Sequence, residues 1–427
     1  MKQEIQAIDP KDFFSIVRAI GSDLEHTQVR MIASANADML FHYWKVGHFI
    51  LYLQKKEGWG SKVIDNLSKA IRSKYPDKKG YSRRNIFYMC QFASAYPLEV
   101  LKEMDRIDSL LTTPTIENVL SFTNELNQIV QQPVALIQAT ENQSNTITQQ
   151  PVAQLEEVTE TLSAIYHCDI SQIEEIFKHS AIVRTNWASH VILLNSKLPL
   201  GECYWYITQA VANGWSRNVL QMQIETNLFA RQITAKKVSN FSARLPKPQS
   251  DLANYLMKDP YIFDMMGQTD KMAERDLEQQ LVSHITKYLL EMGSGFAFVA
   301  QQKHFEVGDS DFYADLILYN IQLHAYVVIE LKATPFKPEY MGQLNFYINV
   351  VDDTLRGEHD NKTIGLLLCN GGDKVVAQYA LSGYDQPIGV SDYQLTKSIP
   401  DDLKSALPTV EEVEEELSKI VEQDSER

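Results

Sequence analysis

The sequence predicts an α+β protein in which a long helical N-terminal region precedes a smaller α/β domain with a mixed central sheet. Up to about residue 235, apolar residues recur at the spacing of helices. After residue 295, short segments rich in Val, Ile, Tyr and Phe follow one another as strands do. The order of helix, three strands, helix and strand in the second region is typical of a compact domain with a mixed sheet.

The composition is that of a globular chain without a membrane or secretion signal. An apolar content of 44% over 427 residues is sufficient for two or three domains. No segment approaches the roughly 18 apolar residues of a membrane span, and the first residues lack the apolar core of a signal peptide. The cysteines lie far apart, which favours reduced thiols in the cytoplasm over zinc or disulfides; they are Cys90, Cys168, Cys203 and Cys369.

The N-terminal region consists of two helical halves. In the first half, residues 1–124, we predict helices over about 30–54, 62–75 and 82–94, with Ser61 and Ser82 as caps. Residues 125–160 are rich in Gln, Asn and Thr, and the sequence of residues 131–135 recurs at 149–153, which indicates a flexible linker. Residues 161–250 form the second half, which is helical to about 235 and ends in a polar connector at 239–251.

Residues 251–400 form the predicted α/β domain. A helix is expected at 276–292, followed by strands at 296–307, 312–319 and 324–332. A helix at 338–351, a strand at 363–369, a short helix at 375–381 and a last strand at 387–390 complete it. Residues 401–427 are expected to be an acidic helical tail.

The charge distribution leaves room for an anionic partner. A net charge of -15 argues against nucleic acid, but the C-terminal tail holds much of the excess acid. Residues 55–84 are basic, and residues 231–247 contain basic side chains and no acid. Local patches, rather than the total charge, set the attraction to phosphate. The alternative is that both stretches are ordinary solvated helix faces.

One short motif occurs twice in the helical region. Gly80-Tyr81-Ser82-Arg83-Arg84-Asn85 resembles Gly214-Trp215-Ser216-Arg217-Asn218. Each serine is predicted to cap a helix, and an arginine in a first turn opposes the helix dipole unless it meets an anion. Two helix-turn-helix-like units are one interpretation, and two unrelated capped helices are the other. The DNA-binding candidates are Arg83, Arg84, Arg217, Lys78 and Lys79.

Charged residues occupy two predicted core strands. Asp315 lies inside the strand at 312–319, and Glu330 and Lys332 end the next strand. Residues two apart in a strand share a face, so Glu330 and Lys332 point the same way and Leu331 points the other way. Two carboxylates can hold Mg²⁺, with Mn²⁺ as an alternative, and the metal can activate water at a phosphate. The lysine can position that water or stabilise the charge that develops on the phosphate. The competing interpretation is a partly buried salt bridge.

Three further residues are candidates for the same site. Gln343 and Tyr347 lie one turn apart on the following helix, where they can steady a phosphate and the lysine; ordinary helix packing is the alternative. Glu278, on the helix before the first strand, is a candidate metal ligand or a solvent-facing residue. Asp276 competes with it, and Asp311 is a weaker candidate that suits a turn.

The order of these residues resembles the PD-(D/E)XK nuclease superfamily, and in particular the bacterial YhcG family of nucleases. Ala314 precedes Asp315 where the superfamily often has a proline. The segments that resemble the YhcG family are 295–299, 311–316, 328–332, 336–340 and 342–347 in the C-terminal domain. In the helical region they are 43–47, 59–60, 80–85 and 214–217.

The resemblance implies a restriction-endonuclease-like domain that hydrolyses DNA, beside a helical, winged-helix-like DNA-binding region. By the same match, Asp315, Glu330 and Glu278 are metal ligands, Lys332 is the catalytic lysine, and Gln343 and Tyr347 support it. The leading hypothesis is therefore an Mg²⁺-dependent deoxyribonuclease acting on duplex or branched DNA. The alternatives are an inactive DNA-binding or regulatory protein on a nuclease fold, and a protein scaffold that uses the acidic tail. A homodimer is a further hypothesis.

Overall fold

The computed structural model describes residues 34–53, 62–76, 80–110, 114–131, 154–264, 289, 291–293 and 295–396. The chain divides into two compact units. The helical unit contains residues 1–110 and 126–207, and the sheet unit contains residues 111–125 and 208–427. The division passes through two helices, α5 (Ile116–Gln131) and α9 (Leu200–Ala212). The domain boundaries expected from the sequence stay predictions.

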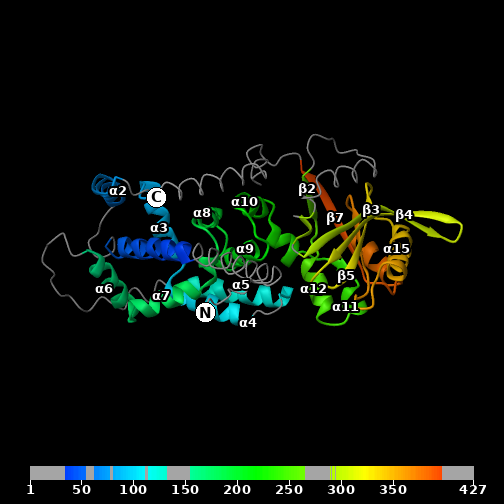
Figure 1. Cartoon of the computed structure of the whole chain (residues 1–427), viewed down its shortest axis with the longest axis horizontal. Coiled ribbons are helices and arrows are strands. Elements are labelled where there is room, and N and C mark those ends of the chain that lie inside the picture. The colour runs from blue at the N-terminus through cyan, green and yellow to red at the C-terminus, as the bar shows by residue number, and fades with distance from the viewer. Residues whose placement is uncertain are drawn as a thin grey trace, which may run out of the picture. The chain divides into compact units, whose positions relative to one another are not determined.

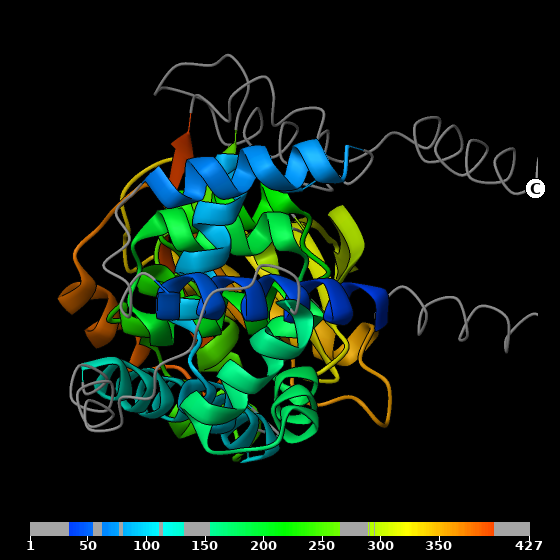
Figure 2. The same ribbon diagram turned by 90° about the vertical axis from the view of Figure 1, so that its left-hand side faces the viewer.

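The described part of the helical unit contains helices and no strand (Figure 2). Its core forms around Trp44, whose side chain is buried and whose Nε1 donates to the Tyr96 carbonyl at 2.7 Å. The Phe177 ring lies 5.6 Å from that of Trp44. After the helical residues 34–53, the elements are α2 (Lys62–Lys74), α3 (Arg83–Ala95), α4 (Leu98–Leu110), α6 (Gln154–Tyr166), α7 (Ile170–His179), η1 (Ala181–Arg184) and α8 (Trp187–Ser196).

The expected linker at 125–160 is shorter at both ends than the sequence suggested. Helix α5 continues to Gln131 and α6 begins at Gln154. The reason is that α5 has an apolar face, on which Val119, Phe122 and Leu126 are buried. Glutamine is also a good helix former, so a glutamine-rich composition does not by itself end a helix. Residues 132–153 lie outside the described residues.

The sheet unit contains the predicted mixed sheet (Figure 1). Strands β3 (Phe296–Val307), β4 (Ser310–Asn320) and β5 (Ala325–Lys332) are antiparallel neighbours. Strands β6 (Ile364–Cys369) and β7 (Ile388–Thr396) continue the sheet in parallel with β5. Helix α15 (Tyr340–Thr354) connects β5 to β6, and α16 (Lys374–Leu381) connects β6 to β7. Each of these elements lies within a few residues of its predicted position.

Three features of this unit differ from the sequence prediction. The connector at 239–251 contains the helix α11 (Phe241–Arg244) and the first three residues of α12 (Gln249–Leu256). Two short strands, β1 (Val238–Ser239) and β2 (Tyr261–Asp264), pair with β7. Strand β7 extends to Thr396, beyond the expected end at residue 390, because β2 pairs with its last residues. Such short strands form by pairing with a segment that is distant in sequence, so the residues within them do little to predict them. Helix α10 (Arg217–Glu225) and η2 (Ala230–Thr234) also belong to this unit.

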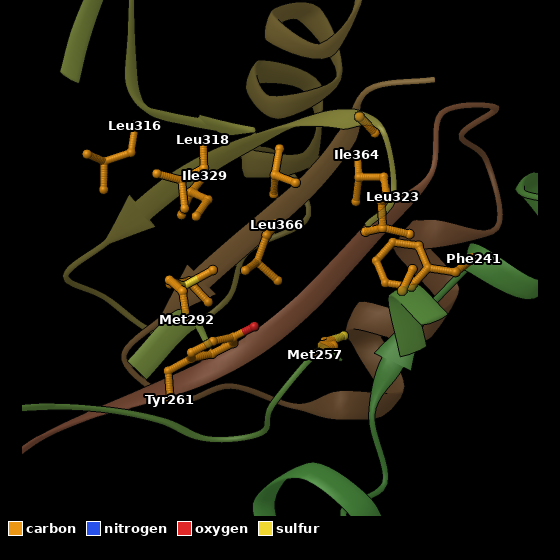
Figure 3. Packing of buried hydrophobic residues seen from close by; sticks show 14 of the residues in the cluster. Phe241, Met257, Tyr261, Met292, Leu316, Leu318, Leu323, Ile329, Ile364 and Leu366 are labelled. Atoms are coloured by element: carbon orange, nitrogen blue, oxygen red, sulfur yellow. The ribbon is translucent and has the colours of Figure 1, made fainter. Parts of the chain in front are cut away.

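The two faces of the sheet bury different side chains. On one face Leu316, Ile329 and Leu366 pack with Tyr261 and Met257 (Figure 3). On the other face Ile317, Val328 and Leu367 pack with Leu344 and Ile348 of α15. Side chains alternate between faces along a strand, and the residues of β5 divide between the two clusters in this way.

Among the described helices, none combines the length and apolar character needed to span a bilayer.

Candidate active site

The three charged residues of β4 and β5 point toward the face that α15 covers. Val328 belongs to the core cluster on that face, and Glu330 and Lys332 follow it at intervals of two. Leu331 belongs to the cluster on the opposite face, as the sequence predicted. Asp315 also lies close to this layer, because its charge acts on the hydroxyl of Tyr347, a residue of α15. The sheet thus brings both acids and the lysine to one layer.

The backbone hydrogen-bond ladder between β4 and β5 ends next to Asp315, whose side chain accepts a hydrogen bond from β5 instead. The last registered pair is Leu316 with Ile329, and one further step would place Asp315 opposite Glu330. Instead, the backbone N–H of Leu331 donates to Asp315 Oδ2 at 2.9 Å. The carboxylate therefore takes the place of a ladder acceptor and holds Asp315 beside the end of β5.

Glu330 and Lys332 form a buried ion pair. Glu330 is fully buried, Lys332 is 7% exposed, and Lys332 Nζ lies 2.8 Å from Glu330 Oε1. This is the salt bridge that was expected from the sequence as the alternative to a metal site. It balances one of the two negative charges. With Asp315 also 7% exposed, the trio carries a net charge of about -1 when all three groups are ionised.

The donor set of this site fits a hard divalent cation. Carboxylate oxygens are the protein ligands that Mg²⁺ and Mn²⁺ prefer. Buried negative charge in excess of the available cations is unfavourable unless another positive group approaches. Asp315 and Glu330 are therefore the residues of the described site that could hold the metal, and Lys332 would remain beside it.

Gln343 and Tyr347 lie on α15 next to this charge. Tyr347 is buried, whereas Gln343 is exposed, and their side chains are hydrogen-bonded to each other. Burial raises the pKa of the Tyr347 hydroxyl, the hydrogen bond to Gln343 acts in the opposite direction, and the negative charges of Glu330 and Asp315 raise it further. The structure thus brings Tyr347 into the electrostatic range of both acids.

The remaining candidate acids are not part of this group as described. Glu278 and Asp276 lie outside the described residues. Asp311 is exposed near the start of β4, where its Oδ1 lies 2.5 Å from His304 Nε2. In the described ranges, three or more His, Cys, Asp or Glu residues nowhere gather as a metal site would require. Two carboxylates are therefore what the described chain contributes.

Sequence reasoning missed Gln302 on β3. Its Nε2 donates to Asp315 Oδ1 at 3.1 Å. Its backbone is also unusual, with a φ of 43°, in a region that non-glycine residues rarely adopt. Nothing in the local sequence distinguishes Gln302 from the preceding Gln301, since the position depends on the pairing of β3 with β4.

The repeated motif of the helical region describes two similar helix starts. Ser82 and Ser216 cap α3 and α10 by accepting from the N–H groups of Asn85 and Val219. The preceding glycines, at 80 and 214, have φ values of 97° and 60°, where glycine has no steric penalty. The caps predicted at Ser82 and Ser216 are therefore confirmed, whereas Ser61 lies outside the described residues.

The arginines after these caps are exposed. Arg83 Nε lies 3.0 Å from Asp65 Oδ1, and Arg84 Nη2 donates to the Tyr88 hydroxyl at 3.3 Å. Arg217 is exposed at the start of α10. Lys78 and Lys79 lie outside the described residues. Part of the adverse interaction of Arg83 with the helix dipole is thus offset by an acid of this chain.

A pocket lies beside the start of α3. Its volume is about 700 Å³, and Lys69 and Arg72 of α2 contribute two cationic side chains to its wall. The other lining residues are Ser73, Pro76, Gly80, Tyr81 and Ser82. The pocket therefore brings two cations of the basic stretch next to the capped start of α3, within the helical unit.

In the second basic stretch, at 231–247, Arg231 and Lys237 are engaged within the chain, whereas Lys236 and Lys247 are exposed. Arg231 is 5% exposed, and its Nη1 lies 2.6 Å from Glu291 Oε1. Lys237 Nζ donates to the Asn254 carbonyl at 2.5 Å. The acid that pairs with Arg231 lies about sixty residues away in sequence, so a count of local charges could not reveal it.

Two family models match this chain. Residues 254–408 match the YhcG PDDEXK nuclease domain, and residues 19–130 match the DUF1016 N-terminal domain. The chain is also similar to Putative nuclease YhcG of Escherichia coli (strain K12), with 28% identity over 203 residues. That match covers 47% of this chain and 54% of the relative, so the chain spans about half the length of that protein.

Two solved structures show weaker similarity. A repair endonuclease from Pyrococcus abyssi is 14% identical, with 31% of this chain and 50% of that chain covered and a TM-score of 0.21. The EndoMS–dsDNA2 complex is also 14% identical, with 32% and 49% covered and a TM-score of 0.21. The chain therefore contains a region that matches the DUF1016 N-terminal domain and a region that matches the YhcG PDDEXK nuclease domain, and it is similar in sequence to a YhcG nuclease.

Proposed function

We propose that this protein is a metal-dependent nuclease that hydrolyses DNA phosphodiester bonds. The observation that carries the proposal is the buried group of Asp315, Glu330 and Lys332 on the α15 face of the sheet. Two acids with a single lysine suit a divalent cation and an anionic substrate together. Because the family model describes a nuclease domain, the chemistry of the site and the family agree.

Each residue has a separate task in this proposal. Asp315 and Glu330 hold Mg²⁺, or Mn²⁺ in its place, and Glu278 is proposed as a further ligand. When bound, the metal supplies a Lewis acid that polarises the phosphate and lowers the pKa of water. Lys332 stabilises negative charge that develops on the phosphate oxygens. Gln343 and Tyr347 orient the substrate phosphate by donating hydrogen bonds to it, and they orient the lysine by accepting hydrogen bonds from its ammonium group.

The helical unit is proposed to bind the DNA backbone, and α10 of the sheet unit contributes one further candidate. The candidates are the exposed Arg83 and Arg84, Arg217 at the start of α10, and Lys78 and Lys79. Lys69 and Arg72 of the adjoining pocket extend this set. Contacts of this kind attract any DNA sequence, because phosphates are the same throughout the duplex.

The decisive experiment compares cleavage of supercoiled, linear, single-stranded and branched DNA in Mg²⁺, Mn²⁺ or EDTA. We expect metal-dependent cleavage by the wild type and a loss of at least about 100-fold in Glu330→Gln and Lys332→Met, as for other lost charge-stabilising groups. The exposed Glu358→Gln and Lys362→Met provide the same chemical changes away from the site. Circular dichroism and thermal melting establish that each variant is folded.

The outcome separates two functions. Cleavage that survives both Glu330→Gln and Lys332→Met rejects the assigned site. DNA binding without cleavage on all four substrates favours the inactive DNA-binding protein. A homodimer stays a prediction; light scattering that gives a monomer mass at all concentrations, with and without DNA, would reject it.

A further inference from the structure

Gln302 occupies an unusual position on β3, directly across from Asp315. On either side of it, Gln301 pairs with Leu316 and Lys303 pairs with Ala314. At Gln302 itself the backbone has a φ of 43°. A side chain in this region is strained, and such strain persists where the surrounding structure enforces it, often at functional sites.

The side chain of Gln302 completes a clamp around the Asp315 carboxylate. Nε2 of Gln302 donates to Oδ1 at 3.1 Å, and the N–H of Leu331 donates to Oδ2 at 2.9 Å. The two donors belong to β3 and β5, the strands on either side of β4. Each carboxylate oxygen has two lone pairs, so both oxygens retain a lone pair for another ligand. The plane of the carboxylate is fixed by donors that carry no charge.

The absence of charge on these two donors is important for the site. A lysine or arginine in the place of Gln302 would neutralise Asp315 and weaken its attraction for a cation. A carboxamide orients the carboxylate and leaves its negative charge intact. Groups that orient a metal ligand in this manner typically change metal affinity or activity by about 10- to 100-fold when they are removed.

We propose that Gln302 is a positioning residue that holds the Asp315 carboxylate in the orientation required by the divalent cation. This inference rests on the proposed function and goes beyond it, because Gln302 carries none of the chemistry assigned to the acids and the lysine. The strained backbone of Gln302 is maintained because it aims the carboxamide at Asp315.

Two substitutions separate the backbone of Gln302 from its side chain. Gln302→Gly relieves the positive φ and removes the donor, and Gln302→Asn tolerates positive φ but is one methylene too short to reach Oδ1 in the same way. His324 provides a matched control, since it is an exposed non-glycine residue with a φ of 48° in the turn between β4 and β5. His324→Gly relieves similar strain away from the carboxylates.

The test measures Mn²⁺ binding by calorimetry, Mn²⁺-dependent cleavage of a supercoiled plasmid, and thermal unfolding without metal. We expect Gln302→Gly to melt at the same or a higher temperature than the wild type, as His324→Gly does. Both Gln302 variants should bind Mn²⁺ about 10- to 100-fold more weakly and need correspondingly more Mn²⁺ for half-maximal cleavage. Saturating Mn²⁺ should restore much of kcat, whereas His324→Gly should match the wild type in both assays.

Three results would overturn the inference, and they are distinguishable. If the wild type binds Mn²⁺ and cleaves, Asp315→Asn does neither, and both Gln302 variants match the wild type, then the positioning role alone is wrong. If the folded wild type neither binds Mn²⁺ nor cleaves, the proposed function fails, and the inference fails with it. A fall in the melting temperature of Gln302→Gly with unchanged Mn²⁺ affinity would assign Gln302 a structural role instead.

Discussion

Lys332 Nζ lies 2.8 Å from Glu330 Oε1, and both side chains are buried at the end of β5. This pair joins the stability of the sheet unit to its proposed chemistry. The lysine that would stabilise charge on a substrate also balances a carboxylate of the resting protein. Changes at either position therefore alter folding and activity together, and experiments must measure both.

Removing the lysine alone should destabilise the sheet unit strongly. In Lys332→Met the buried charge of Glu330 loses its counter-charge, and breaking a buried pair in this way costs about 3–5 kcal/mol. The double variant Glu330→Gln/Lys332→Met should recover much of that loss, because the Glu330 charge is removed together with its counter-charge and the net charge of the site returns to about -1. Urea unfolding without metal measures both values. Equal destabilisation of the single and double variants, with Lys362→Met as the surface control, would contradict this prediction.

A divalent cation should raise the stability of the wild type. A ligand that binds only the folded state at about 100 times its dissociation constant stabilises by about 2.7 kcal/mol. We therefore expect Mg²⁺ or Mn²⁺ to raise the melting temperature and EDTA to reverse the effect. Asp315→Asn, which keeps an acceptor for the Leu331 N–H, should lose the shift. A shift of the same size in Asp315→Asn would place the cation elsewhere.

The helical unit should lose stability in acid. Burial lowers the pKa of His48 to about 3 and that of His190 to about 4. Both stay neutral in the folded state, while the unfolded chain takes up protons below its ordinary value of about 6.5. Stability should therefore be complete above that pH and fall below it, by up to about 1.4 kcal/mol per pH unit for each histidine.

Urea unfolding at pH 7, 6 and 5, followed by tryptophan fluorescence, measures this slope. Substitution of His48 by Asn removes one titrating group and should flatten the dependence, although it also lowers stability at pH 7. The exposed His179→Asn serves as the control. An unchanged slope in the His48 variant would show that other groups cause the acid lability.

DNA binding should depend on the cations near the start of α3. The affinity of a protein for duplex DNA falls with salt, with a slope of about 0.9 for each phosphate contact. We expect Arg83→Ala/Arg84→Ala and Lys69→Ala/Arg72→Ala each to weaken binding and to lower the slope by about 2 if both side chains contact phosphate. Fluorescence anisotropy measures the DNA affinity at salt concentrations from about 50 to about 200 mM, a range over which such slopes are resolved.

A matched control for these variants exists in the same unit. Lys102→Ala/Arg106→Ala removes an equal charge from α4, and Arg106 is paired with Glu103 much as Arg83 is paired with Asp65. If all three double variants change the salt dependence of DNA affinity equally, then binding depends only on the total charge of the protein. If none does, the stretch at 55–84 is ordinary solvated surface.

The sequence predicted the sheet unit well because its signals are local. Alternating and apolar segments located β3, β4, β5 and β6, and the spacing of Glu330 and Lys332 gave their shared face. Long-range partners were beyond such reasoning. The two-residue β1, the ion pair of Arg231 with Glu291 and the hydrogen bond of Gln302 to Asp315 each depend on segments that meet only in the folded chain.

The irregular backbone of β3 has a consequence for the protein in solution. Among the described strands, β3 lies at one end of the sheet order, and part of its length carries exposed apolar side chains such as Phe298 and Val299. A flat, regular strand of this kind recruits strands from other molecules. The register shift between Phe298 and Ala300 and the positive φ of Gln302 interrupt its row of donors and acceptors. The irregular backbone that places the Gln302 side chain beside Asp315 therefore also hinders aggregation through the edge of β3.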